Sequence, residues 1–179
     1  SLGDYFKEEQ LAWYWEFLKE TFGDRVNKLH ISCFEGYKDI PKDTQSAKIW
    51  KSLGVPEERI HFYGVDKNWW SRSGEPENMP AGEIGGPDSE VFYDFGTPHD
   101  TKWGKECHVN CDCGRFVEVG NSVFMQFIKQ EGGAFKELPK KNVDFGGGLE
   151  RLAFATTGNP DIFMIDVFDA ARTVLEKHS

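Results

Sequence analysis

Hydrophobic side chains recur at a helical spacing in the first part of the chain. Over residues 4–22 the apolar positions are separated by four, three and four residues, at Leu11, Trp15, Leu18 and Phe22. This period predicts a helix with one buried face, with Asp4 as its N-cap and Gly23 as the residue that ends it. A shorter helix, capped by Asp43 or Thr44, is expected next.

Alternation of apolar and polar residues predicts strands in the middle of the chain. The expected strands are residues 28–34, 60–64, 89–95, 116–130 and 142–145. Along the fourth strand the side chains alternate between a set containing Glu118 and a set containing Asn121, which leaves one face polar enough for a ligand. Gly132 and Gly133 predict the hairpin turn that follows it.

Other segments have no strand period. Residues 66–87 are rich in Gly, Pro, Asn and Glu, so we expect a long functional loop there. Three glycines, 146–148, open a further helix, and an amphipathic helix is expected over residues 165–177. Strands in consecutive order with helices before and after them predict an α+β fold, with an antiparallel sheet and helices on one side.

Composition and charge narrow the classes of protein. The 179 residues include 21 Lys and Arg against 30 Asp and Glu, a net charge of −9, with 39% hydrophobic and 15% aromatic residues. This is typical of one folded domain, and no apolar run is long enough to cross a membrane. The acidic balance argues against a free-standing nucleic-acid binder, so any RNA contact is local or supplied elsewhere. The chain opens with Ser1 and Leu2 rather than Met, and we expect it to be a piece of a longer protein.

The sharpest motif is the run from Val143 to Arg151, in which a strand meets three glycines and then a helix. Glycines let a backbone approach a ligand closely, and a helix N-terminus offers free N–H groups to an anion. Arg151 in the first helical turn would bring planar donors to a phosphate. The plainer alternative is a glycine turn with Glu150 and Arg151 solvated on the helix surface.

Linked motifs give a family resemblance. The strand contains Glu118-x-x-Asn121-x-Val123-Phe124-Met125-Gln126, followed by Leu138-Pro139-x-x-x-Val143-Asp144 and Gly146-x-Gly148-Leu149-Glu150-Arg151. In this order and spacing they resemble the catalytic domain of the alanyl-tRNA synthetases, a class II family. Residues 3–7 are similar to the end of its motif-two strand. Asn68-Trp69-Trp70 and residues 86–94 are similar to its alanine-pocket loop, placed here at 66–87. The resemblance implies that residues 1–179 are a partial aminoacylation domain beginning after motif two.

The resemblance also implies roles for individual residues. Asp144 would accept the α-ammonium of alanine, and Trp70 would donate its indole N–H to the substrate carboxylate. Asn121, Val123 and Gly146 would surround the methyl group. From the residue types alone, Asp144 could equally cap the glycine turn and Trp70 could be a hydrophobic anchor.

For ATP, the resemblance implies that Arg151 holds the γ-phosphate, that Gly148 lies beside the nucleotide and that Glu118 binds Mg²⁺. Asp144 and Arg151 would be the catalytic pair, with a solvated carboxylate as the alternative for Glu118. Two departures from the family pattern are Gly120, where it has Trp, and Phe145, where it has Thr. We expect the Phe145 ring to fill the space left at Gly120.

The implied function is that of an alanine–tRNA ligase: alanine is activated with ATP and transferred to tRNA(Ala), in the cytoplasm and away from membranes. Motif one and the motif-two arginine would precede Ser1, so we expect this piece alone to be an inactive monomer. The main alternative is a non-catalytic interaction module derived from a synthetase. An editing hydrolase is disfavoured because its His and Cys metal motif is missing.

A cysteine-rich segment, residues 99–113, suggests a metal site. His99 precedes Cys107, Cys111 and Cys113, and tetrahedral Zn²⁺ takes four sulfur or nitrogen ligands. His99 or His108 would be the fourth ligand, and the alternative is a loop of reduced thiols with no metal. Cys33 lies on an expected strand and is predicted to be a small buried hydrophobe.

Overall fold

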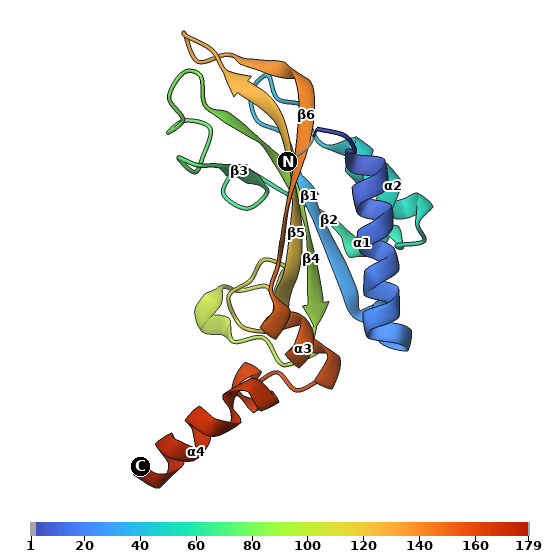
Figure 1. The fold of residues 1–179 in the computed structure, drawn as a ribbon, viewed down its shortest axis with the longest axis vertical. Helices are drawn as coiled ribbons and strands as arrows, with labels where there is room; N and C mark the ends of the chain where they lie inside the picture. Colours follow the sequence, from blue (N-terminus) through green and yellow to red (C-terminus); the bar gives the residue numbers. More distant parts are fainter. Residues whose placement is uncertain (1–2, 179) are drawn as a thin grey trace.

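The computed structural model describes residues 3–178, and within them six strands form one mixed sheet (Figure 1). The strands are β1 (Leu29–Phe34), β2 (Ile60–Tyr63), β3 (Trp69–Ser71), β4 (Ile84–Asp94), β5 (Phe116–Lys129) and β6 (Phe135–Gly147). The helices are α1 (Lys7–Phe22), α2 (Thr44–Ser52), α3 (Leu149–Thr157) and α4 (Asp169–His178). Short 3-10 helices cover Gly23–Lys28, Glu57–Arg59, Thr101–Trp103, Ile162–Met164 and Asp166–Phe168.

The sheet has the strand order β2-β1-β4-β5-β6, and β3 pairs with the first part of the long strand β4. The predicted α+β class is confirmed. The purely antiparallel arrangement is wrong at one edge, because β2 runs parallel to β1. Helix α2 lies between these two strands in the chain and provides the crossover that a parallel pair needs.

One face of the sheet is covered by α1 and α2, as Figure 1 shows. The predicted apolar face of α1 is buried, with Leu11 and Leu18 fully enclosed, and it packs against sheet residues such as Val91 and Val119. Cys33 is buried in the same core, as expected.

The start of α1 differs from the prediction. The helix begins at Lys7 with Phe6 as its N-cap, not Asp4, and residues 3–6 form no strand, so the expected end of the motif-two strand is wrong. At this start the Glu9 carboxylate accepts a hydrogen bond from the Phe6 N–H at 3.2 Å, which satisfies a backbone donor at the helix N-terminus. The first helical residue also makes a buried ion pair: Lys7 Nζ lies 2.6 Å from Asp43 Oδ1, and both side chains are almost fully enclosed. Asp43 also accepts a hydrogen bond from the Ser46 N–H, which confirms it as the cap of α2. Ser1 and Leu2 lie outside the described residues.

Two strands, β4 and β6, extend beyond their predicted bounds, and β3 was not predicted. The segment expected to be a loop, 66–87, contains β3 and the first residues of β4, because Trp69 anchors it in a second apolar cluster with Phe34 and Phe127. Strand β6 includes two of the three glycines, so only Gly148 is left to cap α3. The hairpin between β5 and β6 turns through two glycines with φ of 90°, as predicted.

The C-terminal segment extends away from the sheet (Figure 1). Helix α4 starts later than expected, after two 3-10 turns, and has no buried residue. In the part of the chain that the structure describes, no helix combines the length and apolar character of a membrane span.

Candidate functional site

Most of the predicted alanine-site residues lie side by side on the sheet face opposite α1. Val123 on β5 is paired with Asp144 on β6, and Asn121 is paired with Gly146 two residues along. Paired residues of an antiparallel ladder point to the same face, so these four positions form one patch. Asp144 is exposed and precedes Gly148, the N-cap of α3, by four residues.

A β-bulge in β5 adds Glu118 to the same face. Val91 of β4 is paired with Gly120, but the next residue, Phe92, is paired with Glu118, so Val119 is an extra residue. Val119 is fully buried in the core beneath α1. The bulge therefore resets the alternation, and Glu118 shares its face with Asn121, although simple alternation had separated them.

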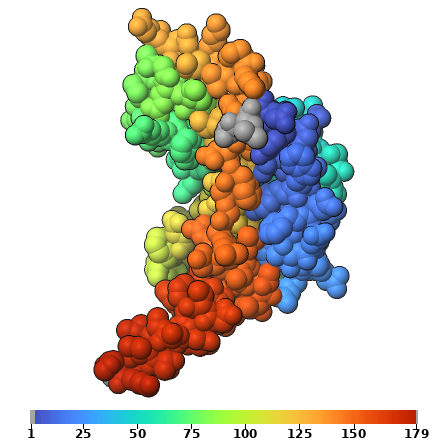
Figure 2. All heavy atoms as spheres, in the orientation of Figure 1, coloured from blue at the N-terminus to red at the C-terminus, as the bar shows by residue number. Residues whose placement is uncertain are grey.

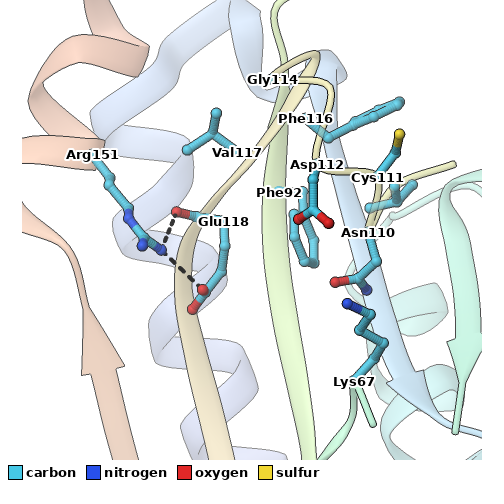
Figure 3. A pocket seen from close by; sticks show the side chains of 11 residues that line it. Lys67, Phe92, Asn110, Cys111, Asp112, Gly114, Phe116, Val117, Glu118 and Arg151 are labelled. Atoms are coloured by element: carbon cyan, nitrogen blue, oxygen red, sulfur yellow. Dashed lines mark hydrogen bonds and ion pairs between the residues drawn. The ribbon is translucent and has the colours of Figure 1, made fainter. Parts of the chain in front are cut away.

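Glu118 and Arg151 meet at the edge of a pocket with a volume of about 300 Å³. Arg151 Nη1 donates to Glu118 Oε2 at 2.9 Å and to the Glu118 carbonyl oxygen at 3.3 Å. Figure 3 shows Lys67, Asn110 and Asp112 facing them across the pocket. Figure 2 shows this side of the molecule hollowed between the green segment that follows β3 and the yellow-green cysteine loop.

Gly148 also lies in this region, as the N-cap of α3. A side chain there would contact Arg151, because a Cβ atom would lie 3.0 Å from its Cδ. Glycine at this position therefore leaves room for the arginine to reach the pocket.

Two buried carboxylates that the sequence reasoning missed lie beside the predicted patch. Asp88 is paired with Val123 and Glu90 with Asn121, so both acids continue the rows of the patch onto β4. Burial, with the Glu118 charge in support, raises the pKa of Glu90 to about 7, and burial and Glu90 raise the pKa of Asp88 well above its usual value. The signal in the sequence was two acids at alternate positions of an apolar strand.

Asn68 is the residue that holds these acids in place. It is fully buried, and its Nδ2 donates to Asp88 Oδ1 at 2.8 Å and to Ser32 Oγ at 2.8 Å. Ser32 in turn donates to Glu90 Oε2 at 2.9 Å. The floor of the site is therefore a polar network and not an apolar surface.

Trp70 stands apart from the other predicted residues. It lies on β3, opposite Gly86, and strands β4 and β5 separate it from Asp144 on β6. Its side chain is 40% exposed, whereas its neighbour Trp69 is buried as the hydrophobic anchor. Trp70 is therefore available to a ligand.

The expected compensation between Gly120 and Phe145 takes a different form. A Cβ on Gly120 would lie 2.5 Å from the Tyr14 hydroxyl, so α1 fills this space. The Phe145 ring packs edge-on against Tyr14 with centroids 4.8 Å apart, and it contacts Gly147. The prediction was wrong because it did not include a side chain from α1.

The cysteine-rich segment forms a compact cluster, which we call the cysteine knuckle: His99, Cys107, Cys111 and Cys113. Their ligand atoms lie within 4.8 Å of one another. Cys107 Sγ is 3.7 Å from Cys113 Sγ, and Cys111 Sγ is 3.8 Å from His99 Nδ1. His108 instead packs its ring on Tyr63, so of the two histidines left open it is His99 that joins the thiols.

The fold and the site together define a class II tRNA synthetase domain. The family described as tRNA synthetases class II (A) matches residues 1–179, and the chain belongs to this family. Its curated relatives refine the class. The chain is 42% identical over 172 residues to an alanine–tRNA ligase of Treponema denticola and 40% identical over 174 residues to one of Borreliella burgdorferi.

These relatives are much longer than the chain. Each alignment covers 94% of this chain but only 27% of the ligase. An alanine–tRNA ligase of a Thermoanaerobacter species is 42% identical over 173 residues, which are 17% of its length. The chain therefore corresponds to roughly a quarter or less of these ligases.

Proposed function

We propose that this chain is the part of an alanine–tRNA ligase catalytic domain that binds alanine and the phosphate tail of ATP. The observation that carries the proposal is the patch formed by Asp144, Val123, Asn121 and Gly146 on paired strands, next to Glu118 and Arg151. The family membership supports the same assignment. ATP, Mg²⁺, alanine and tRNA(Ala) are the substrates and partners of the whole ligase, which works in the cytoplasm.

In the alanine half of the site, charge and space select the substrate. The exposed Asp144 carboxylate holds the α-ammonium, and Trp70 offers its indole N–H to the carboxylate. The methyl group faces Val123. At Gly146 a Cβ would lie 2.9 Å from Asn121 Oδ1, so a larger residue would displace the amide and fill the pocket.

In the ATP half, the chain supplies opposite charges. Glu118 provides a carboxylate oxygen, the ligand type that Mg²⁺ prefers, and Arg151 provides planar donors for a phosphate. Their ion pair at 2.9 Å keeps both groups at the pocket edge, where Glu118 would hold Mg²⁺ and Arg151 would hold the phosphate. Mg²⁺ supplies neutralisation of the phosphate charge.

The reaction needs no covalent side chain. A carboxylate oxygen of alanine attacks the α-phosphorus of ATP, the bond to pyrophosphate breaks, and alanyl-adenylate forms. The ribose hydroxyl of the terminal tRNA nucleotide then attacks the alanyl carbonyl and releases AMP. The chain contributes positioning and electrostatic stabilisation.

The cysteine knuckle adds Zn²⁺ as a structural cofactor. Bonds of about 2.0–2.3 Å to a tetrahedral Zn²⁺ separate its ligand atoms by about 3.3–3.8 Å. The distances of 3.7 and 3.8 Å within the knuckle fit this geometry. His99 Nε2 lies 3.0 Å from the Gly104 carbonyl oxygen, which leaves Nδ1 for the metal. Such a hydrogen bond from the other ring nitrogen is usual for a histidine that binds a metal.

Calorimetric titration with the non-hydrolysable analogue 5′-O-(N-alanylsulfamoyl)adenosine tests the function. Asp144→Asn is expected to raise the dissociation constant at least about tenfold, because a hydrogen bond to a charged group contributes roughly 1.5–3 kcal/mol. Glu137→Gln is the matched control, since Glu137 is an exposed acid on the same strand that pairs with Lys141. Failure of the analogue to bind, or equal binding by both variants, would refute the proposal.

A further inference from the structure

The knuckle lies directly against the pocket that holds Glu118 and Arg151. Cys111 belongs to both: its thiol is in the cluster, and the residue lines the pocket. Asn110 and Asp112, the residues on either side of it, line the same pocket. Figure 3 shows both side chains on the wall opposite Arg151. Fixing the Cys111 sulfur therefore fixes the two residues that face the proposed nucleotide.

Contacts at the base of the loop and along residues 108–111 hold this wall together with the knuckle. Between β4 and β5 the chain runs through residues 95–115 with one short 3-10 helix. At its base the loop is closed by Arg115, which makes two hydrogen bonds of 3.0 Å to Asp94, and by the Phe95 N–H to the Arg115 carbonyl oxygen. Further out, the Cys111 N–H donates to the His108 carbonyl oxygen at 2.9 Å and the His108 ring packs on Tyr63. The four knuckle residues bring the two arms of the loop together.

The ligand positions suit a role in fixing the loop. His99 lies near the beginning of the loop, and the three cysteines lie in its second half, so one bound metal would join the two arms of the loop. Val109 and Cys111 are buried, and both line the pocket.

We propose that Zn²⁺ bound by the cysteine knuckle builds one wall of the nucleotide pocket, so that the affinity for Mg·ATP depends on zinc. This inference rests on the proposed function of the pocket. Within the wall, Asp112 presents a carboxylate opposite Glu118, and two carboxylates with phosphate oxygens are a common Mg²⁺ environment. The knuckle is then a structural metal site, and removal of its Zn²⁺ weakens the binding of Mg·ATP.

The test separates the metal from the pocket. Cys107 is a knuckle residue that does not line the pocket, so Cys107→Ser removes a metal ligand and leaves the pocket surface unchanged. Arg151→Ala removes a pocket residue and leaves the knuckle intact. Lys105→Ala is the matched control, because Lys105 is an exposed loop residue outside both.

Zinc content is measured by mass spectrometry of metals, and Mg·ATP binding by calorimetry. We expect one Zn²⁺ per wild-type chain, none in Cys107→Ser, and at least a tenfold weaker Mg·ATP affinity in that variant. Chelation of the wild-type protein should give the same loss, and added Zn²⁺ should restore the affinity. The chelated protein serves as the second readout if Cys107→Ser folds poorly.

Hydrogen exchange gives a readout that is independent of nucleotide. Amides of residues 107–114 should lose protection on chelation, while those of α1 do not change. If zinc is absent, or if its removal leaves exchange and Mg·ATP affinity unchanged while Arg151→Ala weakens binding, the inference is wrong and the proposed binding of alanine and Mg·ATP stands. If the zinc-loaded wild-type protein does not bind Mg·ATP, the proposed function fails and the inference fails with it.

Discussion

Replacing Glu90 with glutamine should change how the stability of this domain depends on pH. Burial and the nearby Glu118 raise the pKa of Glu90 from 4.5 to about 7. Because the folded state favours the protonated acid, the stabilisation is complete below the unfolded pKa and is lost as the pH rises through the folded one. Over the full titration the loss is about 3 kcal/mol, of which about 2 kcal/mol falls between about pH 5.5 and pH 8.

Glu90→Gln keeps an oxygen that can accept from Ser32 and removes the charge. Urea unfolding at the two pH values should therefore show the variant gaining about 2 kcal/mol relative to wild type at the higher pH. The raised pKa of Asp88 gives the stability of both proteins a further pH dependence of the same sign. Glu131→Gln, at the exposed hairpin, is the control. If the difference in free energy of unfolding between Glu90→Gln and wild type were the same at both pH values, the Glu90 carboxyl would not be held protonated.

Two further changes test the packing around α1. Asp43→Ala leaves the Lys7 ammonium buried without its partner, and we expect urea unfolding to show a loss of about 3–5 kcal/mol; a loss of under about 1 kcal/mol would contradict this. Gly120→Ala places a methyl group against the Tyr14 hydroxyl and the Gly146 carbonyl oxygen, with an expected cost of about 1–3 kcal/mol. Adding Tyr14→Phe should recover part of that loss, and no recovery would place the strain elsewhere.

The periodic elements could be predicted from the sequence, because burial alone fixes them. The apolar face of α1, the long β5 and the Asp43 cap all follow from local spacing. Strand β3 could not be predicted in this way. It is three residues long, and it forms because Trp69 finds a buried cluster built from distant parts of the chain.

The residues of the candidate site likewise fall into those that the sequence could predict and those that it could not. Asp144, Asn121 and Val123 came from the family motifs, and the pairing of β5 with β6 brings them together. Their neighbours on β4, Asp88 and Glu90, became visible only once the strand register was known. Likewise, spacing offered two histidines for the knuckle, and only tertiary packing distinguished His99 from His108.

The single extra residue in β5 has a consequence for how this domain tolerates insertions and deletions. The bulge absorbs Val119 and so keeps the amino-acid half and the nucleotide half of the site in phase on one surface. A chain that lacked Val119 would pair as a regular ladder and keep Glu118 on the face of Asn121, at the cost of one buried core residue. One more residue inserted here without a second bulge would instead turn Glu118 beneath α1 while Asn121 stayed in place. Length at this point of the strand is therefore as much a determinant of the site as the identity of the side chains.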